Sequence, residues 1–203
     1  MRHGETEWNA TKRAQGQADL PLNDAGRRQA AEAARALATE TVEAVYASDL
    51  VRATDTAEAI AERHGLKVIR DPRLREIDQG EWEGLTGPEI RRRWPGQWEG
   101  SRHVERRPGG ESPEEVTRRA LEALADIVAR HPHGTVVVVS HGGTIRWISA
   151  EALGYGVAGS GALRGLLNGG LVSVEAKLEG GTLALANLVR WDGMTPDLDD
   201  PNV

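Results

Sequence analysis

The chain has 203 residues, a formal net charge of -6 and no cysteine. Its length suits one domain, which we expect over residues 1–192, followed by a loose acidic tail over 193–203. An acidic chain lacks the basic face of a general nucleic-acid-binding protein, and the absence of cysteine excludes disulfides and thiolate metal sites. No apolar run approaches the length of a membrane span. We therefore expect a cytoplasmic protein without nucleic-acid or membrane partners.

Helices and short strands are predicted to alternate through the first third of the chain. Asn23 is a residue type that caps helix N-termini, and Gly65 is the type that ends helices. Ser48 and Asp49 are capping residues as well, placed where a short apolar segment gives way to a helical pattern. We expect a helix over 21–38, a strand over 41–49, a helix over 50–65 and a strand over 66–70.

The alternation continues in the second half of the chain. Ser112 and Glu115 form a capping-box pattern ahead of a stripe of leucine and isoleucine. The run from Val136 to Val139 has no polar side chain, which is typical of a strand buried on both faces of a parallel sheet. We expect a helical turn over 89–95, a helix over 112–131, a strand over 135–140, a helix over 141–154 and a hairpin over 170–191 around Gly180 and Gly181.

This order of elements predicts an α/β fold, a three-layer α/β/α sandwich with a mostly parallel central sheet and a C-terminal hairpin. Residues 94–110 are rich in Gly, Trp and charge and predict a lid-like insertion. Ligands of such sheets bind at the carboxyl ends of the strands. Ser48, Glu76 and His141 all follow predicted strands, so we expect one edge of the sheet to carry the site.

Two histidines, two arginines and one carboxylate are predicted to gather at this edge: Arg2, His3, Arg52, Glu76 and His141. Each of them alone would be read as an ordinary surface or turn residue. His3, His141 and Glu76 could also hold a metal ion, but the two arginines would repel a dication. Arginines hold phosphate with paired hydrogen bonds, and an imidazole can attack phosphorus. The set therefore favours an anion pocket that contains imidazoles and needs no metal or cofactor.

Two other reaction classes lack their sequence patterns. A serine hydrolase needs Gly-x-Ser-x-Gly after a strand, whereas Ser160 stands in Gly-Ser-Gly and follows no predicted strand. A Walker phosphate loop needs Gly-x-x-x-x-Gly-Lys-Ser/Thr, which the sequence does not contain.

Six segments resemble the histidine phosphatase superfamily, also called the phosphoglycerate-mutase-like family. They occur in the order typical of that family: RHGETEWN, QGQADLPLNDAGRRQA, SDLVRATDTA, LREIDQGEWEG, PGGES and VVVSHGG. The likeness runs from residue 2 to about residue 155 and weakens after that. The resemblance implies the family's α/β fold and a phosphoryl-transfer activity.

The resemblance also implies roles for the predicted cluster. His3 would be the nucleophile that forms a phosphohistidine, and Arg2 and Arg52 would clamp the phosphoryl oxygens. His141 would complete the pocket, and Glu76 would give a proton to the leaving oxygen. Glu81 and Glu83 are rival carboxylates, but Glu76 matches the family position.

Further residues are expected to bind substrate. Asn9, Gln15, Gly16 and Gly142 would line the phosphate site. Within the lid-like segment, Trp94 and Trp98 could cover a sugar or an apolar group. Arg102, His103, Arg106 and Arg107 could meet a second anionic group, although a solvated charged loop explains them equally well.

Two sequence blocks typical of the family's mutases are changed or absent here, which favours hydrolysis over mutase activity. A mutase of this family would carry an ERHYG-like block at the glutamate and a proline-rich block, whereas this chain has REIDQG at the first and lacks the second. We expect a metal-independent phosphomonoesterase acting on a small phosphorylated metabolite, with glucosyl-3-phosphoglycerate as an example. The alternatives are a cofactor-dependent phosphoglycerate mutase and a catalytically weak protein that binds a phosphorylated ligand. A homodimer is possible on family grounds.

The start of the chain raises one more expectation. In the family, the Arg-His-Gly-Glu segment follows the first strand of the sheet, and here only Met1 precedes it. A nucleophile needs rigid support. We therefore expect the native protein to have roughly 5 to 10 further residues before Met1, about the length of one strand.

Overall fold

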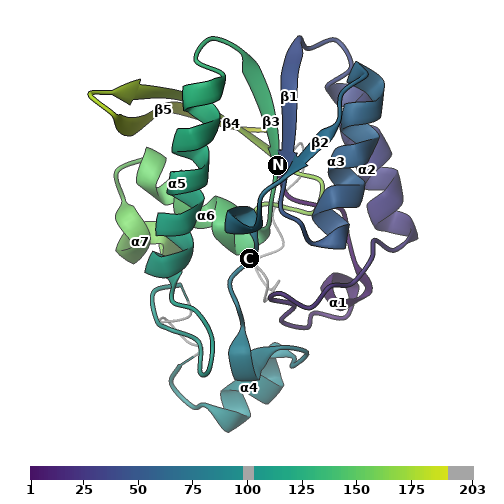
Figure 1. The fold of residues 1–203 in the computed structure, drawn as a ribbon. Coiled ribbons are helices and arrows are strands. Elements are labelled where there is room, and N and C mark those ends of the chain that lie inside the picture. The colour runs from purple at the N-terminus through teal and green to yellow at the C-terminus, as the bar shows by residue number, and fades with distance from the viewer. Residues whose placement is uncertain (98–102, 192–203) are drawn as a thin grey trace.

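Figure 1 shows the computed structural model, which describes residues 1–97 and 103–191. A parallel sheet of three strands lies at its centre in the order β2-β1-β3. The strands are β1 (Val42–Ala47), β2 (Val68–Arg70) and β3 (Thr135–Val139). Tyr46 on β1 is opposite Ile69 on one side and Val138 on the other, which sets the register. The predicted parallel sheet is confirmed.

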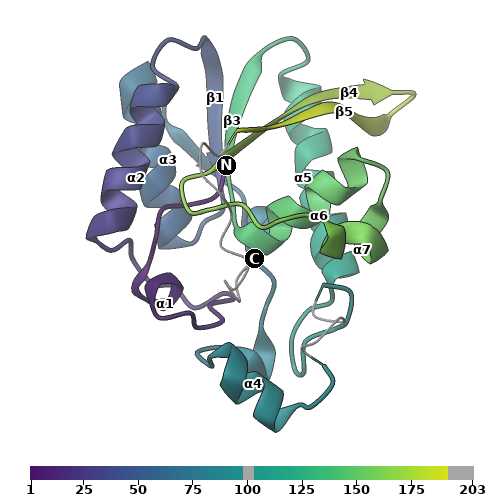
Figure 2. The ribbon, with the colours of Figure 1, turned by 180° about the vertical axis from the view of Figure 1, so that it is seen from behind.

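Helices cover both faces of this sheet, as Figures 1 and 2 show from opposite sides. α2 (Asp24–Ala36) and α3 (Val51–His64) lie on one face, and α5 (Pro113–Arg130) and α6 (Gly142–Ala152) lie on the other. Alternate side chains of β1 explain the two layers, because Val45 packs into the same core as Ile60 of α3, while Tyr46 packs with Ile127 of α5. Strands buried on both faces read as continuous apolar runs, so the predicted three-layer sandwich is confirmed.

Shorter elements connect and flank the three layers. They are α1 (Glu7–Ala10), the 3-10 turns η1 (Pro72–Leu74) and η2 (Gly80–Trp82), α4 (Gly87–Arg93), α7 (Gly156–Gly159) and the 3-10 turn η3 (Ser160–Ala162). β4 (Leu171–Glu179) and β5 (Thr182–Trp191) pair with each other as the predicted C-terminal hairpin. The hairpin projects past α5 in Figure 2, and its turn uses Gly180 and Gly181 at positive φ.

The helix ends follow the predicted capping chemistry with one exception. Asn23 accepts a hydrogen bond from the Gly26 N–H at the start of α2, and the capping box of α5 is present. The expectation that Ser48 and Asp49 cap α3 is wrong, because Leu50 holds the N-cap position without a side-chain hydrogen bond. Asp19 replaces them and accepts from the Val51 N–H at 2.7 Å. A residue that is distant in the sequence thus accepts the hydrogen bond that a local N-cap side chain would accept.

The first residues extend the sheet at β3. The Met1 amino group donates to the Val138 carbonyl at 2.7 Å, and the Ser140 N–H donates to the Met1 carbonyl at 2.9 Å. The His3 N–H then donates to the Ser140 carbonyl at 3.0 Å. His3 is therefore held by the backbone at the end of β3. The expected strand before Met1 concerns residues outside this sequence and stays a prediction.

The part of the chain around η2 and α4 leaves the sandwich at the carboxyl edge of the strands, and α4 lies farthest out in Figure 1. Trp82 and Ile90 of this part pack with Ala14 in a small separate core. Of the predicted lid over 94–110, residues 98–102 lie outside the described part of the chain. Closure over the site stays a prediction.

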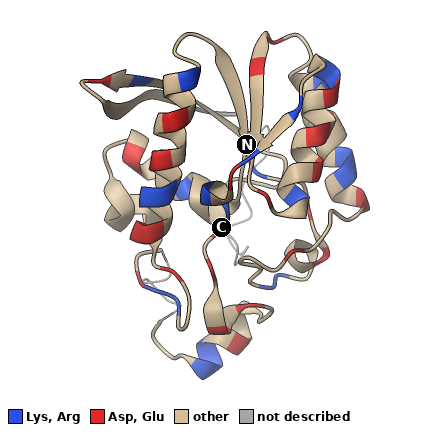
Figure 3. Ribbon diagram, viewed as in Figure 1, with Lys and Arg blue, Asp and Glu red and all other residues tan. Residues whose placement is uncertain are grey.

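The described surface mixes both signs of charge. Figure 3 shows Lys and Arg interspersed with Asp and Glu along α3 and α5. Within residues 1–97 and 103–191, no helix is long and apolar enough to cross a membrane. The expected tail over 193–203 lies outside the described residues, so the predicted domain boundary stays a prediction.

Candidate active site

Four of the predicted residues come together, buried, at the carboxyl edge of the sheet. Arg52 lies in the first turn of α3 just after β1, and His141 lies between β3 and α6. Arg2 and His3 stand beside the end of β3. The exposed fractions of Arg2, His3, Arg52 and His141 are 1%, 3%, 1% and 0%. The two imidazole centroids lie 5.1 Å apart.

The hydrogen bonds of His3 fix which of its nitrogens carries the proton. The Arg52 Nε lies 3.2 Å from the His3 Nε2, and a guanidinium can only donate. The His3 Nε2 must therefore accept, which leaves the proton on Nδ1. The Nδ1 lies 2.6 Å from the Gly4 carbonyl oxygen and donates to it. His3 thus presents the lone pair of a neutral imidazole toward Arg52.

The electrostatic surroundings keep both imidazoles neutral. Burial lowers the pKa of His3 well below its ordinary value, and the charges of Arg52 and Arg2 lower it further. Burial, Arg52 and His3 lower the pKa of His141 in the same way. Burial also lowers the pKa of Arg52 to about 10, which still leaves its guanidinium charged at neutral pH. The pocket therefore combines fixed positive charge with uncharged imidazoles.

His141 has hydrogen-bonding capacity that the described protein residues do not use. Both of its ring nitrogens are buried without a hydrogen-bond partner among the described residues. Leaving a buried polar group unsatisfied costs about 1–3 kcal/mol. An oxyanion bound between His3 and His141 would supply the missing partner.

The backbone around the pocket holds the two arginines in place. Arg52 donates through its terminal nitrogens to the carbonyls of Gly16 and Ala18, each at 2.8 Å. Arg2 donates to the Leu166 carbonyl at 2.7 Å. With the bond to His3, Arg52 uses three of its five N–H groups on the described residues. Both side chains are therefore anchored beside His3, and Arg52 keeps two N–H groups for an anion.

The glycine after His3 is required by close packing. A methyl group on Gly4 would lie 2.4 Å from the Gly26 carbonyl oxygen in the first turn of α2. The Gly4 N–H donates to Thr56 of α3 at 3.0 Å. The segment that carries His3 is thus pressed between two helices, which gives it firm support.

Asn9 and Gln15 lie in a network beside His3. The Asn9 side-chain oxygen accepts from the Thr6 N–H and from Asn168 Nδ2, while Gln15 accepts from the Thr6 hydroxyl. Asn168 also donates to the His3 carbonyl at 3.1 Å. Their predicted contact with substrate stays a prediction. Asn168 is not among the residues predicted for the site, and no local pattern indicates that it contacts His3.

Glu76 lies on the irregular segment between η1 and η2, with its carboxylate against the start of α6. Its oxygens accept from the Gly143 N–H at 3.0 Å and from the N–H and hydroxyl of Thr144 at 3.2 and 3.3 Å. These hydrogen bonds fix the direction of the Glu76 carboxylate. His141 immediately precedes α6, so these bonds place the carboxylate near the start of the helix that follows His141. Burial lowers the pKa of Arg52, and Glu76 is the first of the charges that oppose this shift.

The two glycines after His141 have different surroundings. Gly142 is the buried first residue of α6. A methyl group on Gly143 would lie 2.7 Å from a Glu76 carboxylate oxygen and 3.0 Å from the Trp147 ring. The second glycine is thus the residue that makes room for Glu76. The substrate contact predicted for Gly142 stays a prediction.

The rival carboxylates have other contacts. Glu83 accepts from the Ala18 N–H at 3.0 Å, and Glu81 lies against Gly109. Within the described part of the chain, neither of them accepts a hydrogen bond from α6, whereas Glu76 accepts three.

The arginines of the predicted lid differ from one another. Arg106 is exposed and pairs with Glu115 of α5. Arg107 is only 5% exposed, donates to the Gln79 side chain at 3.0 Å and lies over the Trp82 ring. Arg102 lies outside the described residues. Substrate binding by these arginines stays a prediction.

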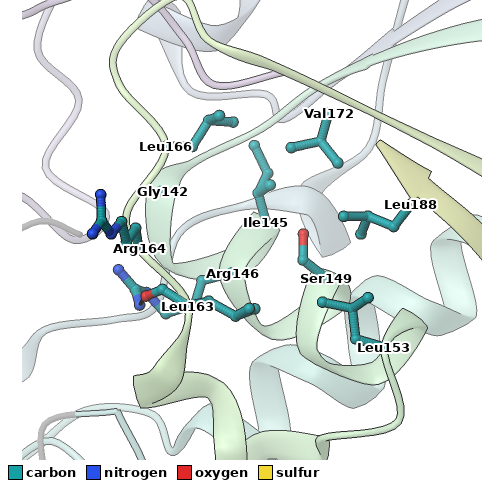
Figure 4. Close-up of a pocket in the computed structure, with 10 residues that line it drawn as sticks. All are labelled: Gly142, Ile145, Arg146, Ser149, Leu153, Leu163, Arg164, Leu166, Val172 and Leu188. Carbon is teal, nitrogen blue, oxygen red and sulfur yellow. Dashed lines mark hydrogen bonds between the residues drawn. The ribbon is translucent and has the colours of Figure 1, made fainter. Parts of the chain in front are cut away.

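A cavity lies between α6, residues 163–166 and the hairpin (Figure 4). Gly142 is among its lining residues, and Figure 4 shows aliphatic side chains such as Ile145 and Leu188 around it. Its volume is about 50 Å³, enough for a few water molecules. It is too small to enclose a sugar phosphate.

The described residues include no cluster of three or more His, Asp or Glu side chains that could hold a metal ion. His3 and His141 face guanidinium groups, and these oppose a dication. A parallel sheet with buried imidazoles and arginines at its carboxyl edge defines an α/β protein with an anion-binding site suited to phosphoryl groups.

Comparison with known proteins identifies the family. The histidine phosphatase superfamily (branch 1) matches residues 1–189. A glucosyl-3-phosphoglycerate phosphatase from Mycolicibacterium vanbaalenii is 38% identical over 202 residues, which cover 94% of this chain and 89% of the relative. A probable phosphoglycerate mutase from Cronobacter sakazakii is 40% identical over 157 residues, covering 76% of this chain and 73% of the relative.

A solved structure shares the fold across nearly the whole chain. A mycobacterial glucosyl-3-phosphoglycerate phosphatase in complex with VO3 superposes with a TM-score of 0.86 at 36% identity. The match covers 94% of this chain and 96% of that one. This protein therefore belongs to the histidine phosphatase superfamily, and the resemblance found in its sequence is confirmed.

Proposed function

We propose that this protein is a metal-independent phosphomonoesterase that hydrolyses a small phosphorylated metabolite through a phosphohistidine. The observation that carries the proposal is the pair of buried, neutral imidazoles held among guanidinium groups. His3 has an unprotonated Nε2 toward Arg52, and His141 has two unsatisfied ring nitrogens. The relatives' phosphatase names support the same reaction class.

In the first step, the His3 Nε2 lone pair attacks phosphorus and the bond to the ester oxygen breaks. The Arg52 Nε–H that contacts Nε2 turns to a phosphoryl oxygen as the new N–P bond forms. Arg2 and His141 donate to the other equatorial oxygens, whose charge the guanidinium groups offset. For this donation His141 carries a proton on the nitrogen that faces the phosphoryl group.

Glu76 completes this step as the proton donor. An alkoxide is a strong base, so a positioned acid contributes about a hundredfold or more to its departure. In the second step the Glu76 carboxylate takes a proton from water, the water oxygen attacks phosphorus and the N–P bond breaks. Inorganic phosphate leaves, and His3 returns to its neutral form.

Glucosyl-3-phosphoglycerate is the substrate that we propose, because relatives with this activity match the chain from end to end. In this proposal, residues 94–110 contact the second anionic group of the substrate. Arg106 is an exposed cation among the described residues of that segment. The protein acts in the cytoplasm on a free metabolite and needs neither nucleic acid nor membrane. Assembly into a homodimer is part of the same proposal.

A phosphatase assay with trapping of the intermediate tests the reaction. Wild type and His3→Ala are incubated with p-nitrophenyl phosphate and with glucosyl-3-phosphoglycerate, and acid-labile phosphate on the protein is measured after rapid quenching. We expect turnover and labelling in wild type only. Equal turnover in both proteins would contradict a catalytic His3 and favour the catalytically weak binding protein instead.

Mutase activity is the second candidate, supported by the mutase relative. Incubation with 3-phosphoglycerate and a bisphosphoglycerate primer separates the two activities. We expect release of phosphate with little 2-phosphoglycerate. Formation of 2-phosphoglycerate faster than phosphate would overturn the phosphatase proposal and establish the mutase.

A further inference from the structure

The segment that carries Glu76 is bound by one arginine of α5. Arg119 donates through NH1 to the carbonyls of Arg73 and Arg75, each at 2.7 Å. Through NH2 it donates to the carbonyl of Glu76 itself at 3.0 Å. One guanidinium therefore binds the backbone carbonyls of Arg75 and Glu76, which stand on either side of the Glu76 N–H, and also the carbonyl of Arg73.

Glu111 orients this guanidinium and also holds the segment directly. Its carboxylate accepts from the Arg119 Nε at 3.0 Å and from NH2 at 2.9 Å. The same carboxylate accepts from the Asp78 N–H at 2.9 Å, and the Glu111 N–H donates back to the Asp78 carbonyl at 3.1 Å. Burial opposes the charge of Glu111, but the bonds from Arg119 and Asp78 hold its pKa below the usual range.

The donors of Arg119 are fully used. A guanidinium has five N–H groups in a planar fork, and the two contacts to Glu111 and the three to carbonyls account for all of them. The side chains of Arg119 and Glu111 are 17% and 25% exposed. Lysine has three donors and no fork, so it cannot reproduce this arrangement.

The Glu76 segment has little regular structure to support it. It connects two 3-10 turns of three residues each, η1 and η2. α5, in contrast, has 18 residues and packs its apolar face on the sheet. Arg119 and Glu111 thus join a rigid helix to a loop whose carboxylate must reach a leaving oxygen. Proton transfer requires hydrogen-bond distance between donor and acceptor.

We propose that Arg119, oriented by Glu111, is a positioning residue that sets the reach of the Glu76 acid to the leaving group. This inference rests on the proposed role of Glu76. It predicts that loss of either residue lowers the rate more for a leaving group that must be protonated than for one that need not be. The pair makes no hydrogen bond to His3 or Arg52 in the described structure. Arg119 acts on the phosphate pocket as one of the charges that, after burial, Arg52 and His3, lower the pKa of His141.

The test compares two leaving groups in the full-length protein. p-Nitrophenolate departs without a proton, whereas the alkoxide of glycerol 3-phosphate needs one. We expect Arg119→Met to lower kcat/KM for glycerol 3-phosphate about ten- to a hundredfold, with kcat/KM for p-nitrophenyl phosphate changed by less than about threefold. Because kcat/KM covers only the steps up to departure of the leaving group, the later attack by water, in which Glu76 is the proposed base, does not enter the comparison. Arg119→Lys should show the same selective loss. Arg118→Met, on the exposed neighbouring position of α5, is the matched control and should leave both rates unchanged.

Glu76→Gln separates this inference from the function on which it rests. We expect Glu76→Gln to show the same leaving-group selectivity, and Arg119→Met added to it to cause no further loss on glycerol 3-phosphate. Selectivity in Glu76→Gln but equal losses on both substrates in Arg119→Met would overturn the positioning role alone. Absence of selectivity in Glu76→Gln would overturn the acid role and this inference with it.

Glu111→Gln gives a second route if Arg119→Met does not fold. It keeps the side-chain volume and removes the charge that orients the guanidinium. We expect a smaller selective loss on glycerol 3-phosphate, about three- to tenfold. Full activity of a folded Glu111→Gln on both substrates would overturn the proposal.

Discussion

The phosphate pocket and the Glu76 segment, two halves of one candidate site, are built in different ways. The pocket residues stand where regular elements meet, with Arg52 in the first turn of α3 and His141 between β3 and α6. Glu76 lies on an irregular segment whose position depends on side chains of other elements. The difference separates a candidate anion pocket held by regular elements from a proposed acid held by long-range side-chain contacts. We therefore expect changes in those contacts to alter leaving-group preference while phosphate binding is retained.

Removal of the nucleophile should have the largest effect. We expect His3→Ala to lower kcat on every phosphomonoester by on the order of a thousandfold or more. The effect should appear with every leaving group, because each phosphomonoester needs the same proposed nucleophile. Steady-state kinetics with p-nitrophenyl phosphate and glycerol 3-phosphate measure it, and vanadate or phosphate binding by calorimetry serves as the folding control. A loss confined to glycerol 3-phosphate would contradict the assignment.

Removal of the Arg52 side chain should have the second largest effect on the rate and should also change its pH dependence. Arg52→Met should lower kcat/KM about a hundred- to a thousandfold through lost stabilisation of the transferring phosphoryl group. Arg52 also lowers the pKa of His3, so its removal lets the His3 pKa rise. His3 is then protonated, and inactive, up to a higher pH. The acid limb of kcat/KM should therefore shift to higher pH in the variant, and a shift to lower pH would contradict this electrostatic role.

Sequence patterns indicated which residues gather in the pocket, but they did not indicate the side-chain contacts that hold the neighbouring segments in place. Arg52 and His141 follow strands, so the topology of a parallel sheet alone places them at one edge. Arg119 contacts the carbonyl of Arg73, which is 46 positions away in the chain, and no local pattern encodes that contact. Asp19 caps α3 from a distance in the same way. Local sequence patterns therefore do not predict long-range contacts between side chains and loop backbones.

Gly143→Ala tests the Glu76 half of the site directly. The new methyl group would lie 2.7 Å from a Glu76 oxygen, so the carboxylate must move. We expect kcat/KM for glycerol 3-phosphate to fall about ten- to a hundredfold, because a displacement near 1 Å has effects of this size. The value of kcat/KM for p-nitrophenyl phosphate should change far less. Gly142→Ala is an unsuitable control because Gly142 is a proposed phosphate ligand. Gly161→Ala, whose methyl group would make an ordinary contact with the His103 ring at 3.6 Å, tests the cost of a methyl group elsewhere.

Arg106 and Arg107 should give the smallest effects on catalysis and differ from each other in stability. Arg106 is exposed and pairs with Glu115 on the surface, so Arg106→Ala should change the free energy of unfolding by less than about 1 kcal/mol. Arg107 is buried against Trp82 and bonded to Gln79, so Arg107→Met should destabilise the fold by about 1–3 kcal/mol.

Urea unfolding of the two variants measures this difference, and kinetics complete the comparison. Both variants should keep the wild-type rate on p-nitrophenyl phosphate. If Arg106 meets a second anionic group, Arg106→Ala raises KM for glucosyl-3-phosphoglycerate and leaves kcat unchanged, since lost ground-state binding acts on KM alone. An unchanged KM would remove Arg106 from the substrate site. Adjacent arginines that are alike in the sequence would then both serve the structure of the loop, one by burial and one by a surface ion pair.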